Sequence, residues 1–226
     1  MKTYWGSTKN TSKRKRKISN DNSDSDSDKS DISITKLPFI IPKNISTSLY
    51  SQFNHIYFNN DITMETAFEL NKELRSVETK IKTMCVSLNI KSEPIYLHLT
   101  TDGGLIYAAL SIIDCIETLS LPVYTVIDGF VASAGTLISL VGEKRFMCKN
   151  AYMLIHELRG GMWGKMSEMN DEYLNLKKLM NHIIKIYTKK TNITKKELEG
   201  ILKKDITWNL KECIQNGLID EQYNSI

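Results

Sequence analysis

Ser133 lies between two alanines and shortly before Gly135, near the end of the segment 129–135. Small neighbours of this kind let a substrate or another backbone segment approach the serine hydroxyl closely. If a helix begins here, the hydroxyl lies at the positive end of the helix dipole, which favours developing negative charge. The next N–H group, that of Ala134, would then point at an oxyanion. A serine that simply caps a helix looks the same in sequence, so the motif alone leaves both interpretations open.

Two further residues could supply what a serine nucleophile needs. His156 ends an apolar strand, and of the four histidines only it stands at a strand end beside a glycine-rich loop. Imidazole is the usual base for a serine hydroxyl near neutral pH. Asp205 is flanked by Ile206 and Trp208, which predicts partial burial, and a carboxylate there could orient the imidazole. Taken singly, each is explained more simply as a structural histidine or a helix-capping aspartate.

Two glycine-rich turns accompany these side chains. Gly103 and Gly104 follow a predicted strand, where an N–H group without a neighbouring side chain could face a substrate carbonyl. An ordinary strand-to-helix turn would need the same two residues. A second glycine-rich loop, at residues 159–164, follows the strand that ends in His156.

The elements that must position these residues alternate between strand and helix. Thr63 and Thr194 are suitable N-caps for two of the helices, and Asn209 starts a third. The alternation predicts an α/β fold with largely parallel strand pairing. Strands are predicted at residues 56–58, 95–99, 123–127, 145–148 and 152–156, and helices at 62–88, 105–119, after the tight loop 129–135, and at 166–189, 195–202 and 209–217.

The predicted helix at residues 166–189 carries apolar side chains over a wide arc. A surface helix needs only one apolar stripe. We therefore interpret the arc as an oligomer contact, because an isolated subunit would leave part of it exposed to water. The side chains in question are Met169, Tyr173, Leu176, Met180, Ile183, Ile184 and Tyr187.

Composition separates a charged tail from a neutral domain. Residues 1–36 hold nine lysines and arginines and five aspartates, which accounts for the whole net charge of +4. We expect this tail to be disordered, with residues 37–226 forming the folded domain. The basic run at 13–17 would suit a nuclear address, and the Ser-Asp repeat at 23–28 a phosphorylation patch, although a solvated tail explains both.

The remaining composition narrows the class of protein. Because the folded domain carries no net positive charge, nucleic acid is not expected as a partner. The apolar runs are short, and the N-terminus lacks the apolar core of a secretion signal, so a cytoplasmic protein without a membrane contact is expected. The four widely spaced cysteines match no zinc or redox pattern, so we expect reduced thiols and no metal.

From residue 94 to 220 the sequence resembles the proteolytic subunit of the Clp protease. The spacing between motifs agrees without gaps from Gly104 to Asp220, and five motifs in register argue against chance. The matching segments are 95–104 (a strand ending in Ser-Pro-Gly-Gly in the family), 129–135 (Gly-x-Ala-Ala-Ser-Met-Gly), 153–156 (Met-Ile-His), 160–164 (Gly-Gly-x-x-Gly) and 216–220 (Tyr-Gly-Leu-Ile-Asp), with Asp205 at the family's Arg-Asp-Arg-Phe aspartate.

The resemblance implies a serine endopeptidase with a crotonase-like α/β fold, a spiral of β-β-α units with a handle at about residues 157–190. In such an enzyme Ser133 would be the nucleophile, His156 its base and Asp205 the residue that orients the base. The N–H groups of Gly104 and Ala134 would form the oxyanion hole. A strand would pair with the substrate backbone through Gly160, Gly161, Met162 and Trp163.

The resemblance also implies an assembly and its partners. Copies of the chain would form heptameric rings, stacked in pairs through the handle helix, with the active sites enclosed. An AAA+ unfoldase of the Clp type would feed unfolded proteins into the chamber. No cofactor is implied in this subunit, and ATP would act only through the unfoldase.

Several positions depart from the family pattern. Asp102 replaces a proline, Glu157 and Leu158 replace Gln-Pro, and Ile206 replaces an arginine that helps to pair the family's rings.

A non-catalytic ring subunit is the main alternative to a peptidase, although an intact Ser-His-Asp set argues against it. Another member of the superfamily, such as a hydratase or a signal-peptide peptidase, would carry a different set of residues.

Overall fold

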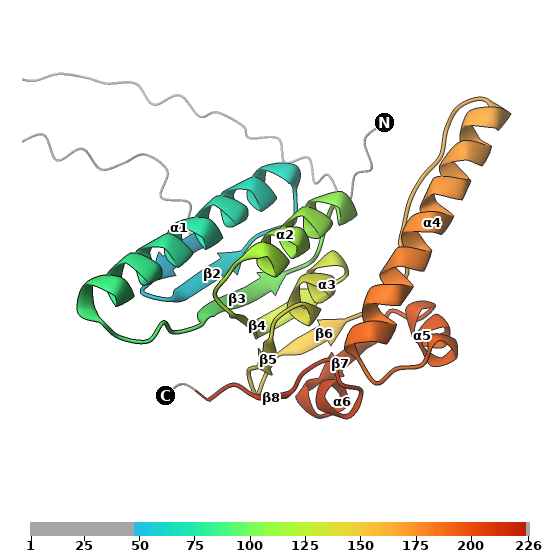
Figure 1. The fold of residues 1–226 in the computed structure, drawn as a ribbon. Helices are drawn as coiled ribbons and strands as arrows, with labels where there is room; N and C mark the ends of the chain where they lie inside the picture. Colours follow the sequence, from blue (N-terminus) through green and yellow to red (C-terminus); the bar gives the residue numbers. More distant parts are fainter. Residues whose placement is uncertain (1–47, 225–226) are drawn as a thin grey trace, which may run out of the picture. The chain divides into compact units, whose positions relative to one another are not determined.

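The computed structural model describes residues 48–224 and shows one sheet with six helices (Figure 1). The predicted tail at 1–36, its basic and Ser-Asp runs, and the domain boundary at residue 37 lie outside the described residues. The elements are β1 (Leu49–Gln52), β2 (His55–Asn59), α1 (Met64–Leu88), β3 (Ile95–Thr101), α2 (Ile106–Thr118), β4 (Val123–Ala132), α3 (Ala134–Leu140), β5 (Lys144–Met147), β6 (Tyr152–Leu154), α4 (Met166–Lys190), α5 (Lys195–Leu202), β7 (Thr207–Asn209), α6 (Leu210–Gln215) and β8 (Glu221–Gln222).

The central strands are parallel, which confirms the α/β prediction. The strand order is β1-β2-β3-β4-β5-β8, and the pairs β2–β3, β3–β4 and β4–β5 are all parallel. Helices α1, α2 and α3 lie side by side over one face of this sheet (Figure 1). Alternate side chains of β3, such as Leu97 and Leu99, are fully buried towards these helices.

The predicted helix starts are confirmed by their capping bonds. Thr63 accepts a hydrogen bond from the backbone N–H of Thr66, and the Thr66 side chain closes a capping box. Thr194 and Asn209 cap α5 and α6 in the same way. These caps hold because a hydroxyl or amide oxygen satisfies a backbone donor that has no acceptor within the helix.

Strand β4 is longer than the sequence pattern predicted. Residues 129–132 were expected in a loop, but β4 continues through Gly129 to Ala132. Its first part pairs with β5, and its last three residues pair with β6 instead. Gly129 has a φ of 73°, so a glycine that suggested a loop instead permits the bend at which β4 changes neighbours. The short strands β1, β7 and β8 were not predicted, since two to four residues show no clear alternation.

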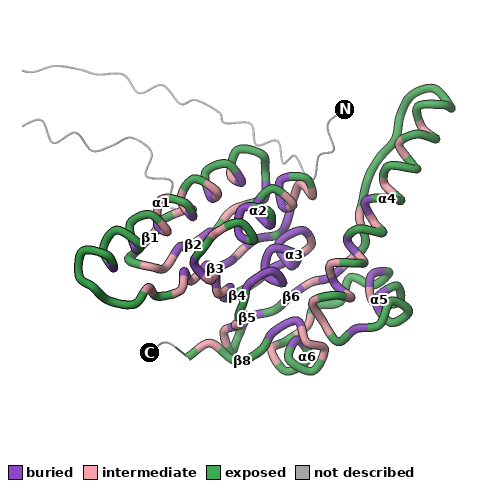
Figure 2. The backbone as a smooth tube through the Cα atoms, viewed as in Figure 1, coloured by how far each residue is buried: buried purple, intermediate pink, exposed green. Residues whose placement is uncertain are grey.

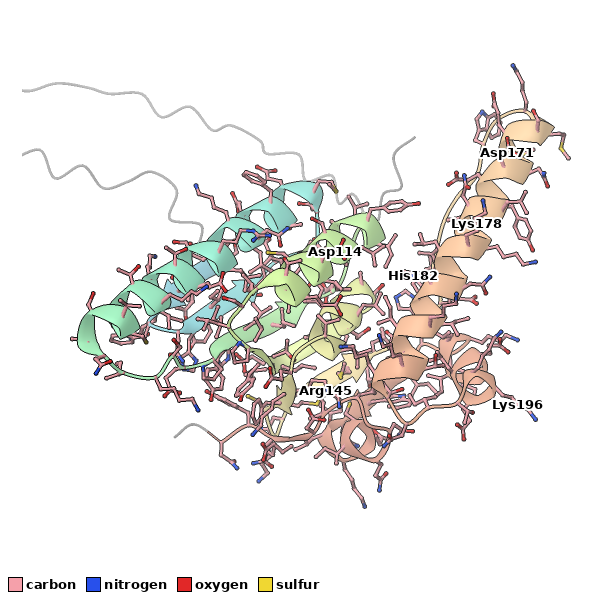
Figure 3. The ribbon with its side chains drawn as sticks, in the orientation of Figure 1. Asp114, Arg145, Asp171, Lys178, His182 and Lys196 are labelled. Atoms are coloured by element: carbon pink, nitrogen blue, oxygen red, sulfur yellow. The ribbon has the colours of Figure 1, made fainter. Side chains whose placement is uncertain are left out.

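Helix α4 forms as predicted, but the interpretation of its apolar residues is partly wrong. Ile183 and Tyr187 are buried in the subunit's own core, and Met180 and Ile184 pack against that core. The second half of α4 therefore needs no partner subunit to cover it. The first half stands away from the sheet and is largely exposed (Figure 2). Asp171 and Lys178 project from this outer part of the helix (Figure 3).

Arg145 of β5 ties the end of the chain to the sheet. Its Nη1 donates to the carbonyl oxygens of Lys190 (2.6 Å) and Gly217 (2.8 Å), and its Nε donates to the Asp220 carboxylate (3.1 Å). One side chain thus fixes the end of α4 and the turn after α6 (Figure 3). This attachment holds α5 and β7, which carry Asp205 between them, in a defined place.

Candidate active site

The turn from β4 to α3 holds Ser133 in a strained conformation. Ser133 has φ 53° and ψ −125°, a region that residues with a side chain rarely occupy. Such a conformation costs on the order of 1–3 kcal/mol, and outliers of this kind cluster at functional sites. The Ser133 side chain makes no capping bond to α3. The helix-cap interpretation of Ser133 is therefore wrong, and its hydroxyl is left for other use.

The end of β3 packs directly against this turn. A Cβ atom added to Gly103 would lie 2.6 Å from the Ser133 Cβ and 2.9 Å from the Ala132 carbonyl oxygen. Gly103 and Gly104 also have φ values of 97° and 144°, which favour glycine. Gly103 is therefore required by close approach to the Ser133 turn, and Gly104 by close approach to the Ile62 backbone, whose carbonyl oxygen an added Cβ atom would overlap. The Asp102 side chain is exposed here.

The two N–H groups that the resemblance assigned to an oxyanion hole are not used by the local backbone ladder. The parallel bridge between Ile62 and Gly104 is made by the N–H groups of Ile62 (2.8 Å) and Leu105 (2.7 Å). The N–H of Gly104 takes no part in that bridge. Ala134 is the first residue of α3, so its N–H has no acceptor within the helix. Both groups lie in the turns that meet at Ser133.

Sheet pairing brings the three candidate catalytic residues to one end of neighbouring strands. Ala132 of β4 pairs with Leu154 of β6, and Leu154 pairs with Thr207 of β7. Ser133 follows the first strand directly, and its N–H donates to the Leu154 carbonyl (2.9 Å). Because β7 runs antiparallel to β6, Asp205, which precedes β7, lies at the same end as His156, which follows β6.

His156 is oriented by a backbone carbonyl. Its Nδ1 hydrogen-bonds to the carbonyl oxygen of Glu157 at 2.8 Å. A carbonyl oxygen can only accept, so Nδ1 carries the hydrogen and the neutral imidazole keeps a lone pair on Nε2. This is the tautomer that a general base for a serine hydroxyl requires.

Asp205 has a different partner from the one the sequence suggested. Its Oδ2 forms an ion pair with Nη2 of Arg159, and its side chain is 57% exposed. The prediction of partial burial is therefore wrong for this subunit, because Ile206 is itself 56% exposed and does not cover the carboxylate. Arg159 was not singled out as a site residue. Arg159 is the first residue of the glycine-rich loop at residues 159–164, and this position in the sequence could have marked it as a site residue.

The segment assigned to substrate binding lies open beside α4. Residues 155–165 form neither helix nor strand, and Gly160, Gly161, Met162 and Trp163 are all exposed. A Cβ atom on Gly160 would meet the Leu176 side chain of α4 at 3.3 Å, whereas one on Gly161 would meet nothing within 4 Å. The segment thus has unpaired backbone groups on a surface that an extended peptide could reach.

A second polar cluster, which the sequence analysis did not identify, lies on the sheet face opposite α1–α3. His55 Nδ1 lies 2.9 Å from His98 Nε2, and His98 Nδ1 lies 2.7 Å from Asp128 Oδ2. The Cys148 thiol donates to Asp128 Oδ1 (3.0 Å). Stacked tyrosines surround this chain of side chains, among them Tyr57 and Tyr96. In the sequence, His55 and Tyr57 are two residues apart in one strand, and Tyr96 and His98 are two residues apart in the adjacent strand. This alternation indicates that the four side chains lie on the same face of the sheet.

Burial and hydrogen bonding shift the pKa values in this cluster. Burial raises the pKa of the Cys148 thiol to about 12, and the Asp128 carboxylate adds to the effect. Burial opposes ionisation of Asp128, but the hydrogen bonds from His98 and Cys148 outweigh it and lower its pKa. Burial and the neighbouring His98 lower the pKa of His55. The cluster therefore favours a charged carboxylate, a neutral thiol and a neutral His55 at pH 7.

The part of the chain from 48 to 224 offers no cluster of three or more His, Cys, Asp or Glu side chains suited to a metal ion. Within the same residues no helix is long and apolar enough to cross a membrane.

Comparison with known proteins defines the class of this fold and site. A ClpP1 mutant of Listeria monocytogenes aligns with a TM-score of 0.63 over 73% of this chain and 88% of its own, at 24% sequence identity. This likeness assigns the fold: the mixed α/β architecture is the crotonase-like fold of ClpP, as predicted. Within this fold, Ser133 lies on the strained turn from strand β4 to helix α3.

Sequence similarity then identifies the family. The family model for Clp protease matches residues 44–225. The ATP-dependent Clp protease proteolytic subunit 2 of Treponema denticola is 32% identical over 69% of this chain and 78% of its own length. The proteolytic subunit of Streptococcus mutans is 34% identical over 58% and 68%, and subunit 1 of Chlamydia muridarum is 26% identical over 82% and 91%. The chain belongs to the Clp protease family and is a serine-type protease.

Proposed function

We propose that this chain is the peptidase subunit of a self-compartmentalising protease that cleaves unfolded polypeptides. The observation that carries the proposal is the Ser133 turn, which holds a serine in a strained conformation, with no capping bond from its hydroxyl, where Gly103 packs against it. A non-catalytic ring subunit would have no reason to maintain this strain. The alternative of a purely structural role is therefore not favoured.

The proposed mechanism passes through an acyl-enzyme. Ser133 Oγ attacks the peptide carbonyl carbon while His156 Nε2 accepts the hydroxyl proton. The N–H groups of Gly104 and Ala134 stabilise the negative charge that develops on the carbonyl oxygen. His156 then gives the proton to the leaving amine, and a water molecule, activated by the same imidazole, releases the acyl group from Ser133.

Asp205 is proposed to orient His156 and stabilise the imidazolium once the reaction begins. Substrate backbone is proposed to pair with residues 160–163 as an added strand, which would give broad sequence preference since main-chain bonds carry the affinity. Enclosure of such a site in a chamber would protect folded proteins from it.

Exposed apolar side chains support the proposed ring assembly. Met162, Trp163, Met166, Tyr173 and Leu174 are between 42% and 88% exposed along the outer part of α4 and the segment before it. Isolated subunits rarely leave so many neighbouring apolar side chains in water. We propose that a second copy of the chain covers them when heptameric rings stack in pairs, and that an AAA+ unfoldase in the same cytoplasmic compartment supplies substrate. No cofactor is proposed in the subunit.

Replacement of the nucleophile tests this function. Ser133→Ala should lower peptide hydrolysis by at least about 10³-fold, because only the attacking atom is lost. His156→Ala should be nearly as damaging, and the double variant no worse, since the two residues act as a unit. Light scattering should show the same assembly mass for the wild type and Ser133→Ala. Undiminished hydrolysis by Ser133→Ala would refute the assignment.

A further inference from the structure

In this structure the base and the carboxylate of the proposed triad have each formed a bond with another group. His156 Nδ1 hydrogen-bonds to the Glu157 carbonyl, and Asp205 is ion-paired with Arg159. We propose that Arg159 is a positioning residue that holds Asp205 in a latched state. The His156–Asp205 bond of the triad then forms only when the Arg159 ion pair opens. This inference rests on the proposed role of Ser133 and His156.

Two backbone ties bracket the residues concerned. The first is the pairing of Leu154 with Thr207, and the second is the hydrogen bond from the Glu157 N–H to the Leu202 carbonyl (2.9 Å). On one segment His156 lies between Leu154 and Glu157. On the other segment Asp205 lies between Leu202 and Thr207. The two segments are therefore held opposite each other, and in the proposed latch the partners are exchanged by rotation of side chains.

The ion pair has to open before Asp205 can change partners. A guanidinium–carboxylate hydrogen bond is charge-assisted, whereas the acceptor of the His156 bond is an uncharged carbonyl oxygen. Nδ1 has a single hydrogen, so it cannot serve Glu157 and Asp205 fully at once. Formation of the triad therefore depends on the partner of Asp205. Opening of the Arg159–Asp205 ion pair is the step that allows Asp205 to bond with His156.

The position of Arg159 links this latch to substrate. Arg159 immediately precedes the exposed segment 160–163, which is proposed to pair with the substrate backbone. When a peptide aligns this segment as a strand, the backbone of Arg159 is drawn into the new alignment and its side chain leaves Asp205. The residue after Asp205 is Ile206, which has no charge and cannot replace the guanidinium. The latch therefore responds to occupation of the substrate segment.

The exposure of the pair limits the size of the effect. The side chains of Arg159 and Asp205 are 48% and 57% exposed, and exposed ion pairs are weak and screened by salt. Loss of such a pair shifts an equilibrium by roughly 1.5- to 5-fold. If substrate binding opens the latch, this factor appears in KM, because only the unlatched fraction binds productively.

The test compares Arg159→Gln with the wild-type full-length chain on a peptide long enough to span residues 160–163. We expect KM to fall by roughly 1.5- to 5-fold while kcat stays the same. Arg159→Lys, which keeps the charge, should restore most of the wild-type KM. Lys204→Gln is the matched control, because it removes an exposed positive charge next to Asp205 that is not part of the pair. A raised KM, a lower kcat or an equal effect in Lys204→Gln would overturn the proposal.

A second comparison isolates the carboxylate. In an Asp205→Asn background, Arg159→Gln should no longer change KM, since the ion pair is already absent. Labelling of Ser133 with a fluorophosphonate separates this inference from the function on which it rests. Wild-type chain that is labelled at Ser133, combined with an unchanged KM in Arg159→Gln, would refute the latch alone. Wild-type chain that is labelled elsewhere would refute the proposed function.

Discussion

The two halves of the candidate site are built differently. The nucleophile half, formed by the end of β3, the end of β4 and α3, is packed inside the subunit, and every residue of α3 is buried. The base half, formed by residues 156–165 and the segment around Asp205, lies at the surface (Figure 2). Close backbone packing fixes Ser133, whereas a backbone hydrogen bond and an exposed ion pair fix His156 and Asp205.

This difference indicates where control of the enzyme resides. A buried turn held by glycine contacts has a single arrangement, because any alternative would open the core. Exposed side chains held by single bonds can exchange partners at little cost. If Ser133 and His156 have their proposed roles, the subunit alone prepares the nucleophile, while the orientation of the base depends on substrate or on neighbouring subunits.

The largest expected effect comes from the glycine that packs against Ser133. Gly103→Ala would place a Cβ atom 2.6 Å from the Ser133 Cβ at a φ of 97°. We expect a loss of unfolding free energy of about 3 kcal/mol or more, together with loss of peptide hydrolysis, because steric overlap and backbone strain add. Chemical denaturation and a peptide assay measure the two effects.

A glycine in the base half provides the matched control. Gly161→Ala adds a Cβ atom with no neighbour within 4 Å, so it should leave the denaturation midpoint unchanged. If Gly103→Ala were as stable and active as Gly161→Ala, close packing would not be what holds the nucleophile.

A smaller effect is expected where α4 meets the nucleophile half. The hydroxyl of Tyr187, which is only 2% exposed, hydrogen-bonds to Thr136, and Thr136 also donates to the Ser133 carbonyl (2.6 Å). Tyr187→Phe should cost about 1 kcal/mol of unfolding free energy, because Thr136 keeps its other acceptor. Tyr173→Phe, on the exposed outer part of α4, should cost nothing measurable. Equal costs would contradict the distinction between the two halves of the helix.

The smallest expected effect is a pH dependence of stability that arises from His55, a residue outside both halves of the site. The pKa of His55 is lowered in the folded chain by burial and by His98, although Asp128 partly opposes the shift. The unfolded chain therefore binds a proton at His55 more readily, so stability should be present above about pH 6.5 and decline as the pH falls below it. His55→Gln should remove part of this decline in Tm, whereas His182→Gln, on exposed α4, should not.

The sequence predicted most of the fold because its strongest patterns correspond to packing. The caps at Thr63 and Thr194, the helix start near Asn209 and the bounds of the long helices were predicted almost to the residue. The continuation of β4 past Gly129 was not, since a glycine at positive φ usually marks a loop and only the pairing with β6 makes it a strand. The partners of Met180 and Ile184 also depend on tertiary packing, which the width of an apolar arc does not specify.

The candidate site residues came from the joint order of motifs along the sequence. Ser133, His156, Asp205 and the glycine turns are each weak signals alone, and their order is what resembles the Clp protease pattern. The Arg159–Asp205 ion pair joins residues 46 positions apart, and neither residue alone suggested the other. The strain at Ser133 is equally invisible in sequence, since it follows from how β3 packs against the turn.

The central claim is that Ser133 is the nucleophile and that the subunit's own packing prepares it. The direct measurement is peptide mapping by mass spectrometry after the full-length chain reacts with a fluorophosphonate. We predict one adduct per chain, located on Ser133, absent from Ser133→Ala and formed far more slowly in His156→Ala. An adduct on another serine, or equal labelling of Ser133→Ala, would contradict the account.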